Sequence, residues 1–369
     1  MALHLKATVL PEGVEREIWV RDGIISHTPA PNAETVLDGG YLLPGLVDAH
    51  CHISLENLGA APRGVSRAHA LQDRDAGTLL IREAGAPDDT HWTGDDPDLP
   101  RIIRAGRWIA RPMRYLMGYA VEVEPGQLVA EVAKQAANSD GWVKIIGDWI
   151  DRKVGDLAPL WPADVAAAAI AQAHRLGVKM TAHCFGEESV AQLVRAGIDC
   201  IEHGTGADTQ TLKIMAERQI PIVPTMTNLE NFPIFAAAGD AKFPVYGSHM
   251  RALYARRFET MREAFELGVP LYCGTDAGGT VPHGLIAGEV KLMAKFSNNE
   301  FALGAASWNA RKWLCVPHTL ADGCPADFVA YAGDPRENLD VLDHPEFVVL
   351  AGRLHLPHAV AIPDVESSR

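Results

Sequence analysis

Short apolar runs alternate with longer amphipathic runs through the middle of the chain. Apolar residues recur with helical spacing at 162–176, 187–196, 209–218 and 251–267, and the apolar runs include 178–182, 198–201, 220–223 and 269–273. Strands and helices that alternate in this way predict a parallel sheet with both faces covered by helices. The region is about as long as the roughly 250 residues that eight strand–helix units need. We therefore expect an α/β fold with a (β/α)8 TIM-type barrel over residues 44–317.

The two ends of the chain show a different pattern, in which short strands are separated by turn residues. Strands are expected at 3–10, 16–21, 23–25, 327–331 and 347–350. Proline, glycine and aspartate between them are typical of turns. We expect the two ends, residues 1–43 and 318–369, to pair into one small β-sandwich domain. The composition is that of an ordered globular protein, and we expect disorder only at residues 366–369.

Composition and charge exclude several classes of partner. The formal net charge of −14 repels nucleic-acid phosphates. No run reaches the roughly 18 apolar residues of a membrane span, and the N-terminus lacks the pattern of a secretory signal. The six cysteines include no Cys-x-x-Cys pair, so neither a zinc ribbon nor a disulfide framework is expected. We expect a cytoplasmic protein that acts on a small molecule. Its oligomeric state stays open, a homo-oligomer included.

The segment 48–52 places two histidines two positions apart in an apolar strand. Strand side chains alternate between faces, so His50 and His52 point to the same side and Cys51 to the other. Two imidazoles that converge on one point are a usual part of a zinc site. By itself, His-x-His also fits a chance pair of core or surface histidines. The metal interpretation therefore depends on partners elsewhere in the chain.

Four further residues with metal-binding side chains lie in predicted strands or at their ends. Lys144 lies within the apolar segment 141–147, and His183, His203 and Asp276 stand where a strand meets its loop. The intervals between successive ligands, starting from His52, leave room for three, one, one and two strand–helix units of about 30 residues. The ligands then fall on strands 1, 4, 5, 6 and 8. Because active sites of such barrels lie at the carboxyl ends of the strands, we expect all six residues to meet there.

Lys144 is the most informative of the six. A bare ammonium buried beside divalent cations is disfavoured both by like charge and by desolvation. The side chain therefore either stays neutral or becomes an anion. The alternative is a lysine at a strand end that extends its ammonium to solvent.

Taken together, these motifs resemble the amidohydrolase superfamily, in particular its prolidase-like and imidazolonepropionase-related members. The matching segments are 42–52, 143–145, 182–183, 202–204, 274–278, 306–314 and 323–329. The resemblance implies two divalent metal ions, zinc in the first place, and a Lys144 that is carboxylated by CO2 and bridges them. It also implies hydrolysis of a C–N amide bond in a dipeptide, an N-acyl amino acid or a cyclic amide. Asp276 would then transfer protons, and His183 and His203 would bind the second ion. One of these two histidines, His203 in the first place, would also orient the substrate carbonyl.

The sequence departs from that subgroup in the loop after the third strand. Where the subgroup often has a turn rich in glycine and histidine, residues 110–118 carry Arg111 and Arg114. These arginines either bind a substrate carboxylate or are solvated charges of the rim. We also expect His283, beyond strand 8, to contact substrate, because polar loop residues at a barrel mouth often carry function.

Two other functions remain open at this point. One is a deaminase or ring hydrolase of the same superfamily with a single metal ion and no carboxylated lysine. The other is a scaffold that has kept the fold and lost the chemistry, because a fold does not by itself imply a function.

Overall fold

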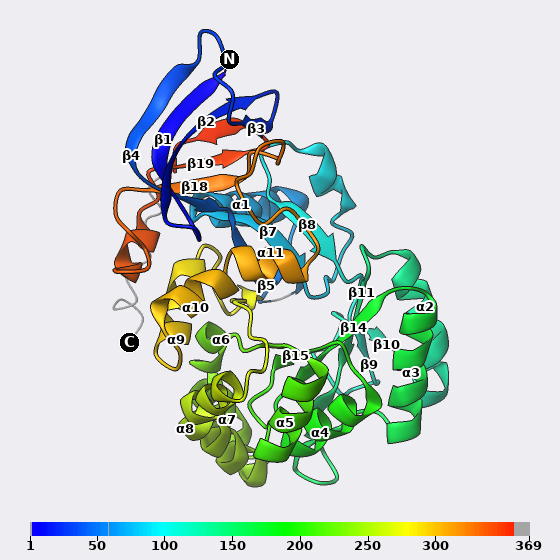
Figure 1. The fold of residues 1–369 in the computed structure, drawn as a ribbon. Helices are drawn as coiled ribbons and strands as arrows, with labels where there is room; N and C mark the ends of the chain where they lie inside the picture. Colours follow the sequence, from blue (N-terminus) through cyan, green and yellow to red (C-terminus); the bar gives the residue numbers. More distant parts are fainter. Residues whose placement is uncertain (1, 58, 358–369) are drawn as a thin grey trace.

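The computed structural model describes residues 2–57 and 59–357 (Figure 1). The segment 366–369, for which disorder is predicted, lies outside the described residues. Within this part of the chain, no helix combines the length and the apolar character that a membrane span requires.

Strands from both ends of the chain share one seven-stranded sheet. Its order is β20-β19-β18-β4-β1-β2-β3. The strands are β1 (Leu3–Val9), β2 (Val14–Arg21), β3 (Ile24–Ser26), β4 (Glu34–Pro44), β18 (Phe328–Tyr331), β19 (Phe347–Leu350) and β20 (Arg353–His355). Along β1 every second residue is buried, which is the pattern of a strand with one covered face. The two ends therefore meet as expected, but the pairing is that of a single sheet. The predicted sandwich is not confirmed, and the domain division stays a prediction.

Two parallel sheets occupy the centre of the molecule. One has the order β17-β5-β7-β8 and the other the order β10-β9-β11-β14-β15-β16. The first contains β5 (Leu46–Glu56), β7 (Thr78–Glu83), β8 (Arg101–Arg104) and β17 (Ala277–Gly279), with β6 (Gly59–Ala60) antiparallel to β5. The second contains β9 (Ile109–Ala110), β10 (Val121–Glu122), β11 (Trp142–Ile146), β14 (Lys179–Cys184), β15 (Cys200–His203) and β16 (Ile222–Val223).

The extended segment 270–276 joins the two parallel sheets on one side. Ile222 of β16 donates its N–H to Pro270 O at 3.0 Å, and Ala49 of β5 donates to Cys273 O at 2.8 Å. Asp276 N in turn donates to His50 O at 2.7 Å. This segment overlaps the apolar run 269–273, where the eighth barrel strand was expected. Mixed α/β architecture is therefore observed, with parallel strands in the predicted chain order.

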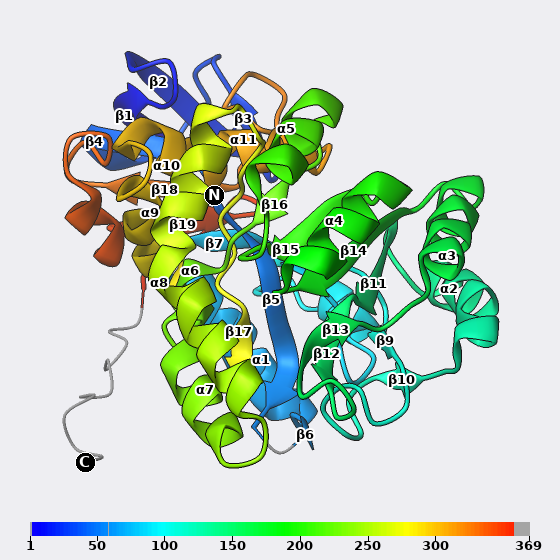
Figure 2. The ribbon, with the colours of Figure 1, turned by 90° about the horizontal axis from the view of Figure 1, so that it is seen from below.

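Helices cover the outer faces of these sheets (Figures 1 and 2). They are α1 (Arg63–Asp75), α2 (Leu128–Ala137), α3 (Ala163–Arg175), α4 (Glu187–Ala196), α5 (Thr209–Arg218), α6 (Met226–Leu229), α7 (Phe232–Asp240), α8 (Pro244–Glu266), α9 (Ile286–Ala294), α10 (Asn299–Ala305) and α11 (Trp308–Trp313). Short 3-10 turns lie at η1 (His91–Asp95), η2 (Pro125–Gln127) and η3 (Leu339–Asp343). An antiparallel hairpin of β12 (Asp148–Asp151) and β13 (Asp156–Pro159) was not predicted.

Local capping explains why two helices have the predicted bounds. In α5, Asp208 accepts a hydrogen bond from Thr211 N at 2.7 Å, which satisfies a free donor at the helix start. Helix α4 ends at Ala196 and is followed by Gly197, whose φ of 88° lies in the left-handed region that glycine adopts readily. Such signals are readable in the sequence. By contrast, α8 begins at Pro244, earlier than the predicted residue 251, because proline at the first helical turn is tolerated.

Candidate active site

Strand β5 brings His50 and His52 to the same point. Their Nε2 atoms lie 3.2 Å apart, and each lies close to Asp276 Oδ1, at 3.1 and 3.0 Å. Asp276 comes from the segment that runs beside β5. The predicted strand parity is therefore observed, and Cys51 points to the opposite face, where its sulfur contacts Asp73.

The tautomers of these two histidines follow from their other contacts. His52 Nδ1 lies 2.8 Å from the carbonyl oxygen of Gly85, which only accepts, so Nδ1 carries the proton. His50 Nδ1 lies 2.9 Å from Glu202 Oε2, and this ionised carboxylate favours the proton on that nitrogen. Both Nε2 lone pairs are then directed at the Asp276 carboxylate. A metal-binding histidine typically has such an acceptor at the ring nitrogen that does not face the metal.

His183 and His203 form a second group beside the first. His183 Nδ1 lies 2.9 Å from His203 Nε2, and His203 Nδ1 lies 2.7 Å from Thr225 Oγ1. The rings of His203 and His50 are 5.1 Å apart between centroids, and His203 Nδ1 is 4.0 Å from Asp276 Oδ2. The two groups therefore adjoin each other, with His183 and His203 at the carboxyl ends of β14 and β15 and with His50 and His52 in the middle of β5.

Lys144 lies in the interior, on β11, paired in register with Thr181 of β14. Its side chain does not reach solvent, because the residue is only 1% exposed. Burial lowers the pKa of Lys144, although the carboxylates of Glu202 and Asp276 act in the opposite direction. Within residues 2–57 and 59–357, no hydrogen bond or ion pair of its ammonium is found. A lysine that is buried without a hydrogen-bond or ion-pair partner is expected to be neutral or chemically modified.

A buried ion pair that the sequence analysis missed lies beneath these residues. Arg82 Nη2 donates to Glu202 Oε1 at 2.7 Å, and both side chains are fully buried. The guanidinium lies over the rings of Trp142 and Trp313, 4.8 and 5.2 Å from their centroids. The signal was present in the sequence, since both charges interrupt apolar strands. Arg82, however, lies outside the segments that resemble the family, and Glu202, within segment 202–204, was given no role.

Burial and charge set the protonation of the site. Burial lowers the pKa of His52 and brings that of His203 to about 3, so both imidazoles stay neutral. Burial raises the pKa of Asp276, but His50 and His52 outweigh it and hold that pKa well below its usual range. Neutral imidazole and ionised carboxylate are the forms that bind divalent metals.

The donor set fits divalent metal ions. Two imidazole lone pairs and a carboxylate oxygen stand within 3.2 Å of one another, and without a cation or an extra proton between them they would repel. His183 Nε2 is buried and has no hydrogen-bond partner in the described part of the chain. His203 and Asp276 have φ values of 68° and 59°, a strained conformation that non-glycine residues keep mainly at functional sites.

Comparison with known proteins shows the family to which the chain belongs. A model of the amidohydrolase family matches residues 41–355. The chain belongs to this family. An uncharacterised protein of Mycobacterium tuberculosis is 51% identical to this amidohydrolase over 357 residues, which cover 96% of each chain.

Solved structures show the same fold at lower sequence identity. A Xaa-Pro dipeptidase with bound methionine in its active site superposes with a TM-score of 0.81 and 22% identity, over 96% of this amidohydrolase and all of that chain. Ochratoxinase of Aspergillus niger superposes with a TM-score of 0.76 and 19% identity, over 96% and 95% of the two chains.

The two residues that were predicted to contact substrate have other partners in this amidohydrolase. Arg114 donates to Asp151 Oδ2 at 2.8 Å and to the carbonyls of Trp149 and Ala158, and so holds the hairpin β12–β13 together. His283 is buried on the Cys51 side of β5, away from His50 and His52. In the described residues, no hydrogen bond or ion pair links either one to the six candidate ligands.

Other side chains that sequence reasoning missed border the candidate site of the amidohydrolase. Asn228 donates its amide to Asp276 Oδ2 at 2.6 Å. Three aromatic rings surround His183, with centroid distances of 6.2 Å for Tyr115, 5.6 Å for Trp149 and 4.3 Å for Phe185. They place an apolar wall beside the polar cluster. The sequence offered no signal for this wall, because loops and a hairpin supply most of it.

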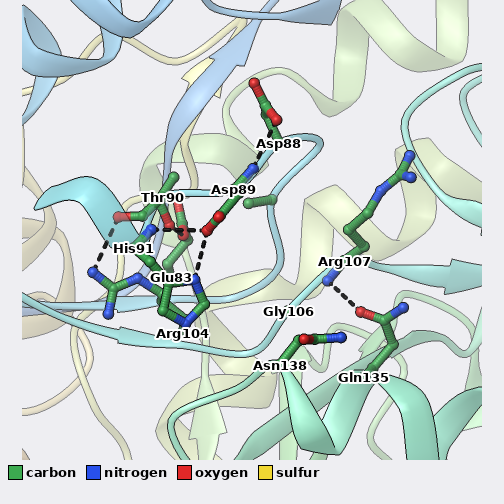
Figure 3. A pocket seen from close by; sticks show the side chains of 11 residues that line it. Glu83, Asp88, Asp89, Thr90, His91, Arg104, Gly106, Arg107, Gln135 and Asn138 are labelled. Atoms are coloured by element: carbon green, nitrogen blue, oxygen red, sulfur yellow. Dashed lines mark hydrogen bonds and ion pairs between the residues drawn. The ribbon is translucent and has the colours of Figure 1, made fainter.

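A separate cavity of about 260 Å³ lies away from this cluster (Figure 3). It adjoins the ends of β7, β8 and α2, and its lining includes Glu83, Asp89, Arg104 and Arg107. None of the six candidate ligands lines it, so we do not assign the amidohydrolase chemistry to it.

Proposed function

We propose that this amidohydrolase hydrolyses a C–N amide bond at a site for two divalent metal ions, with zinc as the metal. The proposed ligands are His50, His52, Lys144, His183, His203 and Asp276. The observation that carries the proposal is the approach of three metal-binding atoms, His50 Nε2, His52 Nε2 and Asp276 Oδ1, to within 3.2 Å of one another. Nitrogen and oxygen ligands of this kind suit zinc.

The two central sheets are proposed to form one (β/α)8 barrel over residues 44–317. The segment 270–276, which bonds to both β16 and β5, supports closure on one side. On the other side, Asp140 N donates to Arg104 O at 2.9 Å, so the chain just before β11 lies beside the end of β8. Such a barrel would present all six ligands at its active-site face.

Lys144 is proposed to be carboxylated by CO2, and its carbamate would help to hold the two ions. Its burial, its lowered pKa and its electrostatic interaction with His50, His183 and His203 support this proposal. The carbamate would replace a buried cation by an anion and so remove the repulsion that two divalent ions impose on an ammonium. His183 and His203 would then hold the second ion.

The protein's own residues account for the movement of protons. Divalent ions, when bound, supply Lewis acidity that lowers the pKa of water and polarises a carbonyl group. Asp276 is ionised at neutral pH and is held by the Asn228 amide, so its carboxylate is placed to accept the proton of an attacking water. It would then deliver that proton to the leaving nitrogen. His203, fixed by Thr225, would orient the substrate carbonyl.

The substrate is proposed to be a dipeptide, an N-acyl amino acid or a cyclic amide. The structural likeness to a Xaa-Pro dipeptidase and to ochratoxinase supports this class, as does the aromatic wall beside His183. Rings at this position suit an apolar group next to the scissile bond.

A substrate panel tests the proposal. Zinc-loaded protein is incubated with Xaa-Pro dipeptides, other dipeptides, N-acyl amino acids, cyclic amides and lactones, and released amine or acid is measured. We expect turnover of at least one amide class and its loss in the Asp276→Asn variant. A folded, metal-loaded protein that hydrolyses none of these compounds would favour a scaffold without catalytic activity.

A ring hydrolase or deaminase with one metal ion is the second candidate. The observation in its favour is that His50, His52 and Asp276 already form a compact set, whereas His183 and His203 contact each other. This enzyme would bind one ion per chain in the six-residue site, and its metal content would not depend on Lys144.

A further inference from the structure

A second buried group lies on the opposite face of β5 from His50 and His52. It consists of Cys51 of β5, Asp73 of α1 and His283 of the loop that follows β17, which are 0, 2 and 4% exposed. Cys51 Sγ lies 3.6 Å from Asp73 Oδ2 and 3.8 Å from His283 Nδ1, and these two atoms lie 2.8 Å apart. Helix α1 and strand β17 both lie along β5 in Figure 2. Three different elements thus meet at one point.

The spacing of these atoms can be compared with a tetrahedral zinc site. Zinc bonds of about 2.3 Å to sulfur and about 2.0–2.1 Å to nitrogen and oxygen predict ligand separations of roughly 3.5–3.6 Å to sulfur and about 3.4 Å between nitrogen and oxygen. The two separations that involve Cys51 Sγ agree with these values to within about 0.3 Å. Only the contact between Asp73 and His283 is shorter, so it alone must open by about 0.6 Å.

Charge also favours a divalent cation at this position. Without a cation, burial first and then the nearby carboxylates raise the pKa of the Cys51 thiol; a bound divalent ion would neutralise the two negative charges of a thiolate and the Asp73 carboxylate. Charged ligands are tolerated in a fully buried position when the charge of the ion balances theirs. Sulfur and nitrogen ligands favour zinc-like ions over magnesium or calcium, which prefer oxygen.

The neighbours of the three side chains hold them in place through other atoms. Asp73 uses its second oxygen, Oδ1, to accept from Gly284 N at 2.7 Å. The ring of His69 stacks on that of His283 with centroids 4.2 Å apart, and His69 is itself anchored to the carbonyl of Ile53. The hydrogen bond to the second oxygen of Asp73 is of the kind that orients ligands in metal sites, whereas His283 Nε2 has no hydrogen-bond partner in the described residues and its ring is held by stacking.

We propose that Cys51, Asp73 and His283 form a structural site for a zinc-like divalent cation, separate from the proposed catalytic site. Water would complete the coordination, and the thiol proton of Cys51 would be released to solvent on binding. The ion would join α1 and the loop after β17 to β5, which carries His50 and His52 on its other face. It would thereby stiffen the strand from which the catalytic ligands extend. This proposal does not depend on the two-metal assignment of the catalytic site.

Cobalt substitution tests the site directly. Co²⁺ bound to a thiolate gives a ligand-to-metal charge-transfer band in the near ultraviolet, and the catalytic group contains no cysteine and cannot produce it. The less buried Cys315 and Cys324 are first replaced by serine, to exclude adventitious binding. We expect the band in this background protein, its loss in Cys51→Ser, and its retention in Cys184→Ser. Cys184 is a matched control, because it is also buried on a strand beside a candidate ligand histidine.

Zinc content gives a second readout that does not use activity. Cys51→Ser and Asp73→Asn should each bind one zinc ion fewer per chain than the background protein, whereas Cys184→Ser should not. Absence of the cobalt band from the folded background protein would overturn the proposal, and this observation requires no substitution in the site. An unchanged zinc content in both variants would also overturn it. The three residues would then be a hydrogen-bonded network in which Asp73 accepts from Cys51 and His283.

Discussion

The buried pair of Arg82 and Glu202 offers a sharp test of how the candidate site is organised. Glu202 contacts Arg82 through Oε1 and His50 through Oε2, at 2.7 and 2.9 Å. Burial raises the pKa of Glu202, but Arg82, His50 and Lys144 outweigh it and keep the pKa well below its usual range. The carboxylate is therefore ionised, and it fixes the proton of His50 on Nδ1 and leaves Nε2 free.

The substitution Glu202→Gln keeps the shape of the side chain and removes its charge. His50 loses its charged acceptor, so its Nε2 lone pair is no longer held toward Asp276. Loss of an outer partner of a metal-binding histidine typically lowers metal affinity or activity by about 10- to 100-fold. That range corresponds to roughly 1.4–2.7 kcal/mol. Arg82 is also left buried without a counter-charge, which costs about 3–5 kcal/mol of folding stability.

Metal affinity and stability have to be measured separately. Zinc affinity is determined by competition with a chromogenic chelator, and the free energy of unfolding is determined by urea denaturation of the metal-free protein. The double variant Arg82→Met/Glu202→Gln serves as the control, because it removes the unpaired charge. We expect the double variant to recover much of the stability but none of the zinc affinity. If Glu202→Gln unfolds more easily yet binds zinc as tightly as the unsubstituted protein, Glu202 supports only the fold and does not position His50.

Two further predictions concern proton transfer and pH. Asp276→Asn keeps the shape of the side chain but lacks the base, so kcat should fall by about 10²- to 10⁴-fold with an unchanged circular dichroism spectrum; an unchanged kcat would assign proton transfer to another group. His249 donates to Glu187 and Asp156, and these contacts, that with Glu187 foremost, raise its pKa to about 9. Protonated His249 therefore stabilises the folded protein. This stabilisation is fully present below about 6.5, the pKa of histidine in the unfolded chain, and it is lost as pH rises through about 9. Because Glu187 and Asp156 are partly exposed, we expect the free energy of unfolding to fall by about 1 kcal/mol across this pH range, as measured by urea denaturation. In the His249→Gln variant, the free energy of unfolding should fall less over this pH range. An equal fall in the variant would assign the pH dependence to other groups.

Much of the candidate site could be predicted from the alternation of side chains along a strand and from the spacing of the predicted strands. The parity of β5 was enough to place His50 and His52 on one face, and the spacing of strand–helix units led to His183, His203 and Asp276. Helices α4 and α5 were predicted with their observed bounds, because a glycine and a capping aspartate mark their ends.

The rest depends on how distant segments meet. Arg82 and Glu202 lie far apart in sequence, and no local pattern indicates that their charges neutralise each other inside the fold. His283 was expected to face substrate, but the direction of a loop after its strand is not encoded in a short motif. The hairpin β12–β13 engages Arg114 through two of its backbone carbonyls, and a sequence does not reveal such backbone acceptors. The pattern of short strands likewise could not show that strands from the two ends of the chain pair in a single sheet.

The central claim is that six residues, Lys144 among them, hold two divalent ions. Zinc per chain, measured by mass spectrometry after exhaustive dialysis, tests it most directly. The measurement is made in a Cys51→Ser background, so that only the catalytic site is counted. We predict two ions per chain, falling to one or none when Lys144→Ala is added. About one tightly bound ion per chain, unchanged by Lys144→Ala, would contradict the two-metal site.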